Sequence, residues 1–264
     1  MADPWFEAQI AAAVAPLLPG LAVEVVDEID STSSELMRRA RDGRTQPVLL
    51  VAKRQTAGRG RMGRAWQSSQ AEQEPASLTF SLGLPLMPRD WSGLSLAVGV
   101  SVAESLDAPN MAKVALKWPN DLWVEERKLG GILIETALPQ DGSAERYLVI
   151  GIGINIGAPE GTGMSTPPAW IAQWRPEATA PQLLREIVPP LVSHVLLFGD
   201  RGFVPFAERF ARRDLLRGRE VQLSDGTLGH CEGVGWGGEL LVRTASGMKN
   251  ITSAEVSVRP RAAT

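Results

Sequence analysis

The 264-residue chain contains one cysteine, two histidines and one tyrosine, and no stretch of 18 consecutive apolar residues. The single cysteine, Cys231, excludes a disulfide within the chain and favours a reducing compartment, for which we expect the cytoplasm. His230 adjoins Cys231 but His194 is remote in the sequence, so the chain lacks the two ligand pairs that a structural zinc site needs. The short apolar runs likewise predict no membrane span.

The charge is nearly balanced, with 27 lysines and arginines against 30 aspartates and glutamates and a net charge of −3. A general nucleic-acid-binding protein normally carries a broad basic surface, which this balance does not favour. The apolar content of 44% is typical of a folded protein, and the length suffices for one large domain or for a large and a small one. The N-terminus lacks a basic segment and carries acidic Asp3 and Glu7, which does not favour a targeting segment. It predicts a short amphipathic helix that is ended by Pro16 and Pro19-Gly20.

Hydrophobic periodicity predicts both strands and helices over the first 216 residues. Apolar runs predict strands over 23–28, 47–53, 76–84, 114–118, 121–124, 129–136 and 147–156. Helical spacing predicts helices over 35–40, 91–106, 183–198 and 203–216, with N-cap candidates at 30–34 and a glycine stop at Gly43. The polar segment 125–128 predicts a hairpin turn, and the Gly- and Pro-rich segment 158–181 predicts a long surface loop.

After Arg219, short strands alternate with Gly-containing turns, which predicts a small five-strand barrel. We therefore expect two domains, over residues 1–217 and 218–264, with the boundary near residue 217. The order of elements indicates the α+β class, with a mixed β-sheet that has helices on one side, followed by an all-β domain.

The most informative segment runs from Arg54 to Trp66, where Arg59, Arg61 and Arg64 alternate with glycines. Glycine permits a close approach of the backbone to a ligand, and arginine offers a planar set of donors that suits phosphate or carboxylate. A cationic loop of this kind can fold over an anionic reaction intermediate. The segment is not a phosphate-binding P-loop, because no Lys-Ser or Lys-Thr follows at the required spacing. The alternative to an active-site loop is a disordered segment that binds nucleic acid.

Four segments, in this order and at this spacing, resemble the signature of the biotin protein ligases. They are Asp30-Ser31-Thr32-Ser33, Gln55 to Trp66, Lys117-Trp118-Pro119-Asn120-Asp121 with Arg127-Lys128-Leu129-Gly130-Gly131-Ile132-Leu133, and Gly151-Ile152-Gly153-Ile154-Asn155. The resemblance covers roughly residues 23 to 260. It implies a class II synthetase-like catalytic domain followed by an SH3-like barrel. It also implies that biotin and ATP form biotinyl-5′-AMP, from which biotin passes to a lysine of a carrier protein.

Such a reaction brings a carboxylate to the α-phosphate of ATP, so cations have to lie between two anions. Arg59, Arg61 and Lys128 are the catalytic candidates, and the resemblance assigns Lys128 to both the biotin carboxyl oxygen and the phosphate. A solvated lysine in a hairpin turn is the alternative for Lys128. Asp121 is the fourth candidate, because a carboxylate beside the attacking amine of the carrier can assist its deprotonation.

The neutral ureido ring of biotin needs paired donors and acceptors in an apolar slot. The resemblance assigns biotin binding to Ser31, Thr32, Ser33, Gln55, Arg59, Gly60, Arg61, Lys128, Gly130, Gly131, Gly151 and Gly153. Helix capping is the alternative for Ser31 and Thr32. Tight sheet packing is the alternative for Gly130, Gly131, Gly151 and Gly153. Ser33 stands where some family members carry asparagine, and its smaller side chain suits contact through its backbone or a water.

ATP or adenylate binding is assigned by the resemblance to Arg59, Arg61, Arg64, Trp66, Asn120, Asp121, Lys128, Asn155 and Trp170. Trp170 matches a tryptophan that packs on the adenine ring, with a loop anchor as its alternative. Trp66 is also explained by packing, and Met62 stands where some members carry another arginine. We expect ATP with Mg²⁺ as co-substrate and counter-ion and biotin as substrate, with no metal held tightly by the protein.

The expected partner is a biotin carboxyl carrier protein or domain of acetyl-CoA carboxylase, and a homodimer is compatible with the resemblance. About 22 residues precede the first expected strand, too few for the winged helix-turn-helix of the biotin-responsive repressors, so we expect no DNA binding. No membrane partner is expected either. Three alternatives stay open: a lipoate or octanoate ligase of the same fold, a nucleic-acid-binding module built on the Arg-Gly loop, and a biotin sensor without catalytic activity.

Overall fold

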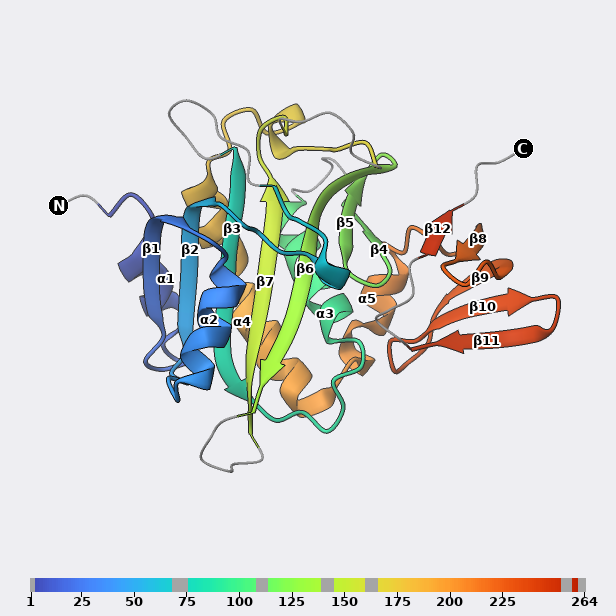
Figure 1. Ribbon diagram of the computed structural model, residues 1–264, viewed down its shortest axis with the longest axis horizontal. Coiled ribbons are helices and arrows are strands. Elements are labelled where there is room, and N and C mark those ends of the chain that lie inside the picture. The colour runs from blue at the N-terminus through green and yellow to red at the C-terminus, as the bar shows by residue number, and fades with distance from the viewer. Residues whose placement is uncertain are drawn as a thin grey trace.

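A seven-stranded sheet runs through the larger part of the molecule (Figure 1). The computed structural model describes residues 3–67, 76–107, 114–138, 145–159, 166–252 and 258–260, the last of these as backbone. The spatial order of the strands is β1 (Ala22–Ile29), β2 (Val48–Gln55), β3 (Ser77–Leu86), β7 (Arg146–Asn155), β6 (Arg127–Ala137), β5 (Asp121–Val124) and β4 (Ala115–Lys117). β1 is parallel to β2 and all other neighbouring pairs are antiparallel, which confirms the mixed sheet.

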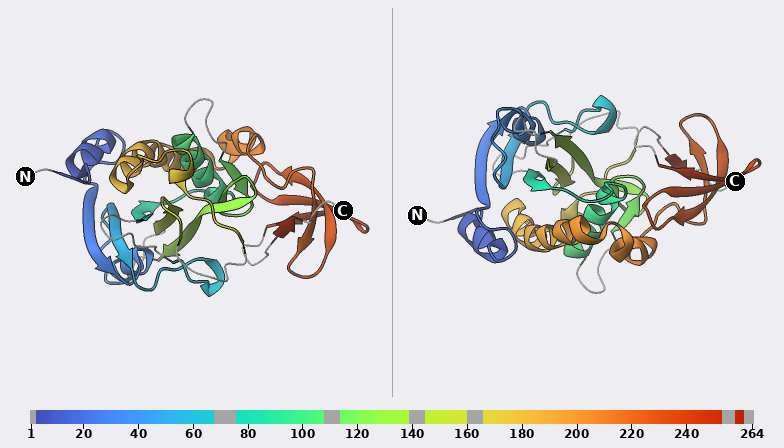
Figure 2. Two further views of the ribbon diagram at one scale, coloured as in Figure 1. Left: turned by 90° about the horizontal axis from the view of Figure 1, so that it is seen from above. Right: turned by 90° about the horizontal axis from the view of Figure 1, so that it is seen from below.

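Helices cover both faces of this sheet (Figures 1 and 2). The helical elements are α1 (Glu7–Val14), α2 (Thr32–Arg41), α3 (Leu94–Leu106), α4 (Ala180–Arg201), α5 (Ala207–Ala211) and the short 3-10 turns η1 (Arg61–Gly63), η2 (Ile171–Gln173) and η3 (Val204–Phe206). α1, α3 and α4 pack on one face, whereas α2 packs on the opposite face. The expectation of helices on one side is therefore wrong.

α2 lies on the opposite face from the other helices because β2 is apolar on both of its faces. Leu49 and Val51 belong to the core shared with α1, α3 and α4, whereas Val48 and Leu50 pack with the buried residues of α2. A strand that is apolar on both faces needs cover on both. The connection between the parallel strands β1 and β2 contains α2, and this helix covers the second face.

The local sequence explains where α2 begins and ends. Ser31 is its N-cap, and the Ser31 hydroxyl accepts a hydrogen bond from the Ser34 N–H at 3.3 Å. At the other end Gly43 adopts a φ of 81° and donates its N–H to the Ala40 carbonyl at 3.1 Å, which confirms the expected glycine stop. The helix start thus fixes three consecutive polar residues above the sheet.

The β5–β6 hairpin turns through two residues, Glu125 and Glu126, whose φ angles are 48° and 62°. Positive φ at both positions is typical of a type I′ turn, whose twist matches that of the flanking strands. The expected turn over 125–128 is therefore too long, and Lys128 lies in β6. A strand position gives this lysine a fixed direction that a turn position would not.

The second sheet contains five short strands in the order β11 (Gly247–Ile251), β10 (Leu240–Thr244), β9 (Leu228–Val234), β8 (Glu220–Leu223) and β12 (Val258–Pro260). All its strand pairs are antiparallel. Within the described residues β11 and β12 form two open edges, so the expected strand number is confirmed but the closed SH3-like barrel is not. The Trp118 indole N–H donates to the Gly238 carbonyl at 3.1 Å and joins this sheet to the larger one.

Two connecting segments differ from the expected pattern. η3 and α5 replace the helix expected over 203–216, because Leu116 pairs by backbone hydrogen bonds with Arg213 and Leu215. In the segment 158–181, residues 160–165 lie outside the described part, and Ala169 and Ile171 are fully buried, so it is not simply a surface loop. None of the described helices combines the length and the apolar character needed to cross a membrane.

Candidate active site

The sheet face toward α2 is lined with small residues at its centre. On β3 the side chains of Thr79 and Ser81 alternate with large apolar ones, and on β7 Gly151 and Gly153 alternate with isoleucines. The large residues join the core on the other face. Because successive strand residues point to opposite faces, this alternation leaves a shallow polar floor beneath α2 and the Arg-Gly loop.

Side chains from two other segments lie directly on this floor. A Cβ atom at Gly151 would overlap with the Ser33 hydroxyl, and a Cβ atom at Gly153 would overlap with the indole ring of Trp66. Gly131 differs, because its Cβ would meet nothing closer than 3.7 Å. The two glycines of β7 are thus required by close packing.

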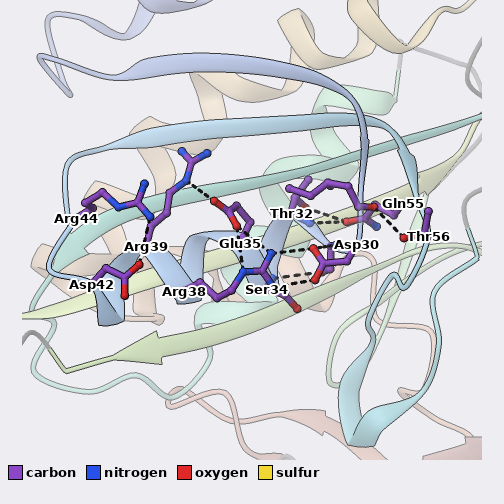
Figure 3. Close-up of polar contacts among 12 residues, drawn as sticks. Asp30, Thr32, Ser34, Glu35, Arg38, Arg39, Asp42, Arg44, Gln55 and Thr56 are labelled. Atoms are coloured by element: carbon purple, nitrogen blue, oxygen red, sulfur yellow. Dashed lines mark hydrogen bonds and ion pairs between the residues drawn. The ribbon is translucent and has the colours of Figure 1, made fainter.

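A network of uncharged polar groups forms one end of the site. The Thr32 N–H donates to Gln55 Oε1 at 2.8 Å, and Thr32 Oγ1 lies 3.1 Å from the same oxygen (Figure 3). Beneath them Ser81 Oγ lies 2.7 Å from Thr32 Oγ1 and 3.0 Å from Ser33 Oγ. Ser31, Thr32, Ser33 and Ser81 are all buried, so these bonds form in a region with little solvent.

An ion pair between Asp30 and Arg38 supports the start of α2. Asp30 accepts the N–H of Ser31 at 2.7 Å and two bonds from the Arg38 guanidinium at 2.8 and 2.9 Å (Figure 3). The hydrogen bond from Arg38 lowers the pKa of the Asp30 carboxyl below its usual value. The carboxylate is therefore charged at neutral pH and holds the start of α2 in place.

The opposite end of the site is cationic. Lys128 Nζ lies 2.7 Å from Asp121 Oδ1, and Arg61 Nη1 donates to Asn120 Oδ1 at 2.9 Å. Burial lowers the pKa of Arg61, an effect that Asp121 opposes and Arg64 adds to. A guanidinium that has lost water and is hydrogen-bonded to a neutral amide gains stability from an anionic ligand.

The Arg-Gly loop folds back on itself above the floor. Trp66 N–H donates to the Gly58 carbonyl at 2.8 Å, and Gly60 N–H donates to the Arg64 carbonyl at 2.7 Å. At the tip of the loop Met62 adopts a φ of 56° and is 61% exposed. Backbone hydrogen bonds thus close the loop into a hairpin-like turn.

Arg59 forms an ion pair with Glu135 of β6. Its guanidinium lies 2.8 Å from Glu135 Oε1 and 3.2 Å from Ser34 Oγ. The second carboxylate oxygen of Glu135 is buried and has no hydrogen-bond partner among the described residues. The Glu135 carboxylate therefore holds Arg59 at the rim in this structure.

The backbone of Lys128 is held from the other side by the segment before η2. Lys128 N–H donates to the Pro167 carbonyl at 2.9 Å, and Ala169 N–H donates to the Lys128 carbonyl at 2.8 Å. The buried Asn155 amide reaches the carbonyls of Ala169 at 3.0 Å and of Lys128 at 3.4 Å. Asn155 thus contacts the chain that carries the lysine.

One pocket collects residues from all four sequence segments. The expected site residues that line it are Ser31, Thr32, Ser33, Gln55, Arg59, Gly60, Arg61, Arg64, Trp66, Asn120, Asp121, Lys128, Gly131, Gly151 and Gly153. Gly130, Asn155 and Trp170 do not line it. A Cβ at Gly130 would meet the Gly153 carbonyl oxygen and the Leu122 side chain, so Gly130 serves strand packing.

Sequence reasoning missed two polar residues beside the pocket, Ser81 and Glu135. The alternation of Ser77, Thr79 and Ser81 with large apolar residues was the available signal for a polar strand face. Nothing comparable marked Glu135, because a charged residue within a strand normally faces solvent.

Comparison with known proteins places these features in a family. Residues 26–155 match the Biotin/lipoate A/B protein ligase family. The chain is 32% identical to the bifunctional ligase/repressor BirA of Escherichia coli over 92% of this chain and 75% of that one. It is 30% identical to the biotin–acetyl-CoA-carboxylase ligase of Paracoccus denitrificans over 86% and 96% of the two chains.

A solved structure agrees with these relatives. The biotin protein ligase from Aquifex aeolicus in complex with biotin and ATP superposes with a TM-score of 0.75 and 29% identity, covering 90% of this chain and 99% of that chain. The fold, the four segments and the curated relatives thus lead to the same assignment. The chain belongs to the biotin protein ligases of the biotin/lipoate A/B protein ligase family.

Proposed function

We propose that this protein converts biotin and ATP to biotinyl-5′-AMP and transfers the biotinyl group to a lysine of a biotin carboxyl carrier domain. The observation that carries the proposal is the polarity of one pocket. Uncharged hydrogen-bonding groups lie at its Ser31–Ser33 end, and Arg61 with Lys128 lies at its other end. A ligand that joins a neutral polar ring to a carboxylate through an apolar chain matches this arrangement. Biotin is such a ligand.

The first step brings the biotin carboxylate to the α-phosphorus of ATP. A bond forms between a carboxylate oxygen and phosphorus, and the bond to the leaving pyrophosphate breaks. Two anions approach each other, so cations fixed near both lower the barrier. We assign this role to Lys128 and Arg61, with Arg59 joining them when it leaves Glu135. Mg²⁺ accompanies the nucleotide phosphates, with few ligands from the protein.

In the second step the amine of the carrier lysine attacks the carbonyl carbon of the adenylate. The new amide bond forms as AMP leaves, and the amine loses a proton. Asp121 Oδ1 lies 2.7 Å from Lys128 Nζ at the cationic end, so we assign Asp121 as the group that orients the amine and accepts this proton. Closure of the Arg-Gly loop would keep water from the mixed anhydride in the meantime.

Residues at the edge of the pocket have a second proposed role in nucleotide binding. Arg64, Trp66 and Asn120 line the pocket. Trp170 follows Ala169, whose N–H bonds the Lys128 carbonyl, so its side chain begins beside the cationic end. We assign the adenine side of the adenylate to this group. We also propose that residues 1–217 form the catalytic domain and residues 218–264 a separate one that contacts the carrier or ATP.

The test is ATP–pyrophosphate exchange with biotin, lipoate and octanoate in parallel. Exchange with biotin, followed by transfer of biotin to a purified carrier domain, is the expected result. Exchange that depends on lipoate or octanoate would overturn the substrate assignment and move the protein to the sister ligases. The proposal includes no DNA-binding role, and a biotin-dependent shift of promoter DNA would contradict that part.

A further inference from the structure

Ser81 lies at the centre of the polar network and has no role in the reaction proposed above. It belongs to β3, is 0% exposed, and does not line the pocket. Its hydroxyl nevertheless contacts two residues of the turn that does, with Thr32 Oγ1 at 2.7 Å and Ser33 Oγ at 3.0 Å. A buried hydroxyl between two others can fix which way each of them donates.

The direction of each hydrogen bond in this network follows from the backbone N–H of Thr32. The Thr32 N–H can only donate, so the Gln55 atom 2.8 Å from it is the amide oxygen. That oxygen can only accept, so the Thr32 hydroxyl donates to it at 3.1 Å. The Thr32 hydrogen is then committed, and Ser81 has to donate to Thr32. Because the only hydroxyl hydrogen of Ser81 is used in the bond to Thr32, Ser81 has to accept from Ser33.

This hydrogen-bond network therefore determines which donors and acceptors the pocket presents to a ligand. The Ser33 hydrogen points to Ser81, so Ser33 presents an oxygen lone pair, which is an acceptor. The Gln55 oxygen is used by Thr32, so Gln55 presents its NH₂ group, which is a donor. A cyclic urea carries N–H donors beside a carbonyl acceptor, which is the complementary pattern. A ligand with the opposite pattern would leave buried groups unpaired, at a cost in affinity.

We propose that Ser81 is a positioning residue that orients the Ser33–Ser81–Thr32–Gln55 hydrogen-bond chain and thereby sets the donor and acceptor pattern of the urea-binding end. This inference rests on the proposed function, because it takes the cyclic urea of biotin as the ligand. Ser81 does not touch the ligand and acts through Ser33. Removing its hydroxyl frees the Ser33 hydrogen, which can then oppose an N–H of the urea.

The test compares Ser81→Ala, Ser33→Ala and the double variant in biotin-dependent pyrophosphate exchange. Each single variant should raise the KM for biotin about tenfold, with kcat changed less than about threefold. The double variant should resemble the single ones, because Ser81 acts through Ser33. Ser101→Ala is the matched control, since Ser101 is a fully buried serine whose hydroxyl has no partner among the described residues.

Three results would overturn the proposal. They are a Ser81→Ala enzyme with an unchanged KM for biotin, a double variant whose effects multiply to about a hundredfold, or an equal rise in KM for Ser101→Ala. Should Ser81→Ala not fold, Ser81→Cys has a similar shape, a slightly larger side chain and a weaker donor, and the same comparison applies. Wild-type protein that shows no exchange with biotin would instead refute the proposed function, which separates the two failures.

Discussion

Lys128 and Asp121 face each other across neighbouring strands, with Nζ 2.7 Å from Oδ1. The two residues are not paired in register: Lys128 pairs with Trp123, Asp121 pairs with Gly131, and the ladder shifts between Leu122 and Trp123. An irregularity of this kind redirects side chains, and here it brings both charges to the pocket. The ion pair with Asp121 holds the lysine at the pocket, and such preorganisation is what electrostatic catalysis requires.

Lys128→Ala should reduce the rate of biotin-dependent pyrophosphate exchange by about a hundredfold or more, because a positioned charge at the reacting phosphate is lost. Circular dichroism and the melting temperature should change little, since the lysine is partly exposed at the pocket. Lys53→Ala is the matched control, because Lys53 lies at the exposed end of β2, where it pairs with Asp27 of β1. A near wild-type exchange rate in Lys128→Ala would refute the role of this residue.

Arg61→Met should separate stability from activity. Burial lowers the pKa of Arg61, so the charged guanidinium is held at a cost that an apolar side chain of similar length does not carry. We expect an unchanged or higher melting temperature together with a KM for ATP raised about tenfold. Thermal denaturation and exchange kinetics measure the two quantities. A variant that melts earlier and keeps its KM would show that Arg61 has a structural role only.

Asn155→Ala should slow the reaction through the backbone of Lys128. The Asn155 amide donates to the carbonyls of Lys128 and Ala169, so its loss loosens the chain beside the lysine. We expect kcat to fall about tenfold while the KM for biotin stays within about twofold, as a displacement of a catalytic group predicts. Asn250→Ala, at an exposed asparagine of β11, is the control. A rise in the KM for ATP alone would indicate direct contact with the nucleotide instead.

Asp214 makes the stability of the fold depend on pH. Burial raises the pKa of its carboxyl from 3.8 to about 6, and its Oδ2 atom has no hydrogen-bond partner within the described residues. A raised folded-state pKa means that the contribution to stability is complete below pH 3.8 and is lost as the pH rises toward about 6. The size of this loss is at most about 3 kcal/mol.

Asp214→Asn should remove this pH dependence. Relative to wild type, its free energy of unfolding should increase between pH 4 and pH 7, because only the wild type has to bury a charge as the pH rises. Urea unfolding at several pH values measures the difference, and Asp200→Asn, at an exposed aspartate, is the control. A difference between variant and wild type that is constant with pH would contradict the burial argument.

Most strands were predictable because they depend on local signals, whereas the four segments that meet at the pocket were identified by their resemblance to the biotin protein ligases. Ser31 caps α2 and Gly43 ends it, as residue types at a helix start and stop require. The face on which α2 lies was not predictable from its own pattern, since that depends on β2 being apolar on both sides. The pairing of Lys128 with the segment before η2 was missed for a similar reason. It joins residues about 40 apart through backbone groups, which no side-chain pattern records.

A pair of glycine substitutions tests the packing of the pocket floor. Gly153→Ala should disrupt the site, because the new methyl group would occupy the position of the Trp66 ring, whereas Gly131→Ala has room, with its nearest neighbours 3.7 Å away. Both substitutions add one methyl to a strand glycine that lines the same pocket, so intrinsic strand preference is matched. We expect Gly131→Ala to keep the melting temperature of the wild type and Gly153→Ala to lower it, since overpacking displaces the loop. Trp66→Ala combined with Gly153→Ala should not be worse than Trp66→Ala alone, because the obstructing ring is gone. If Gly153→Ala melted at the same temperature as Gly131→Ala, the indole ring would have to lie elsewhere.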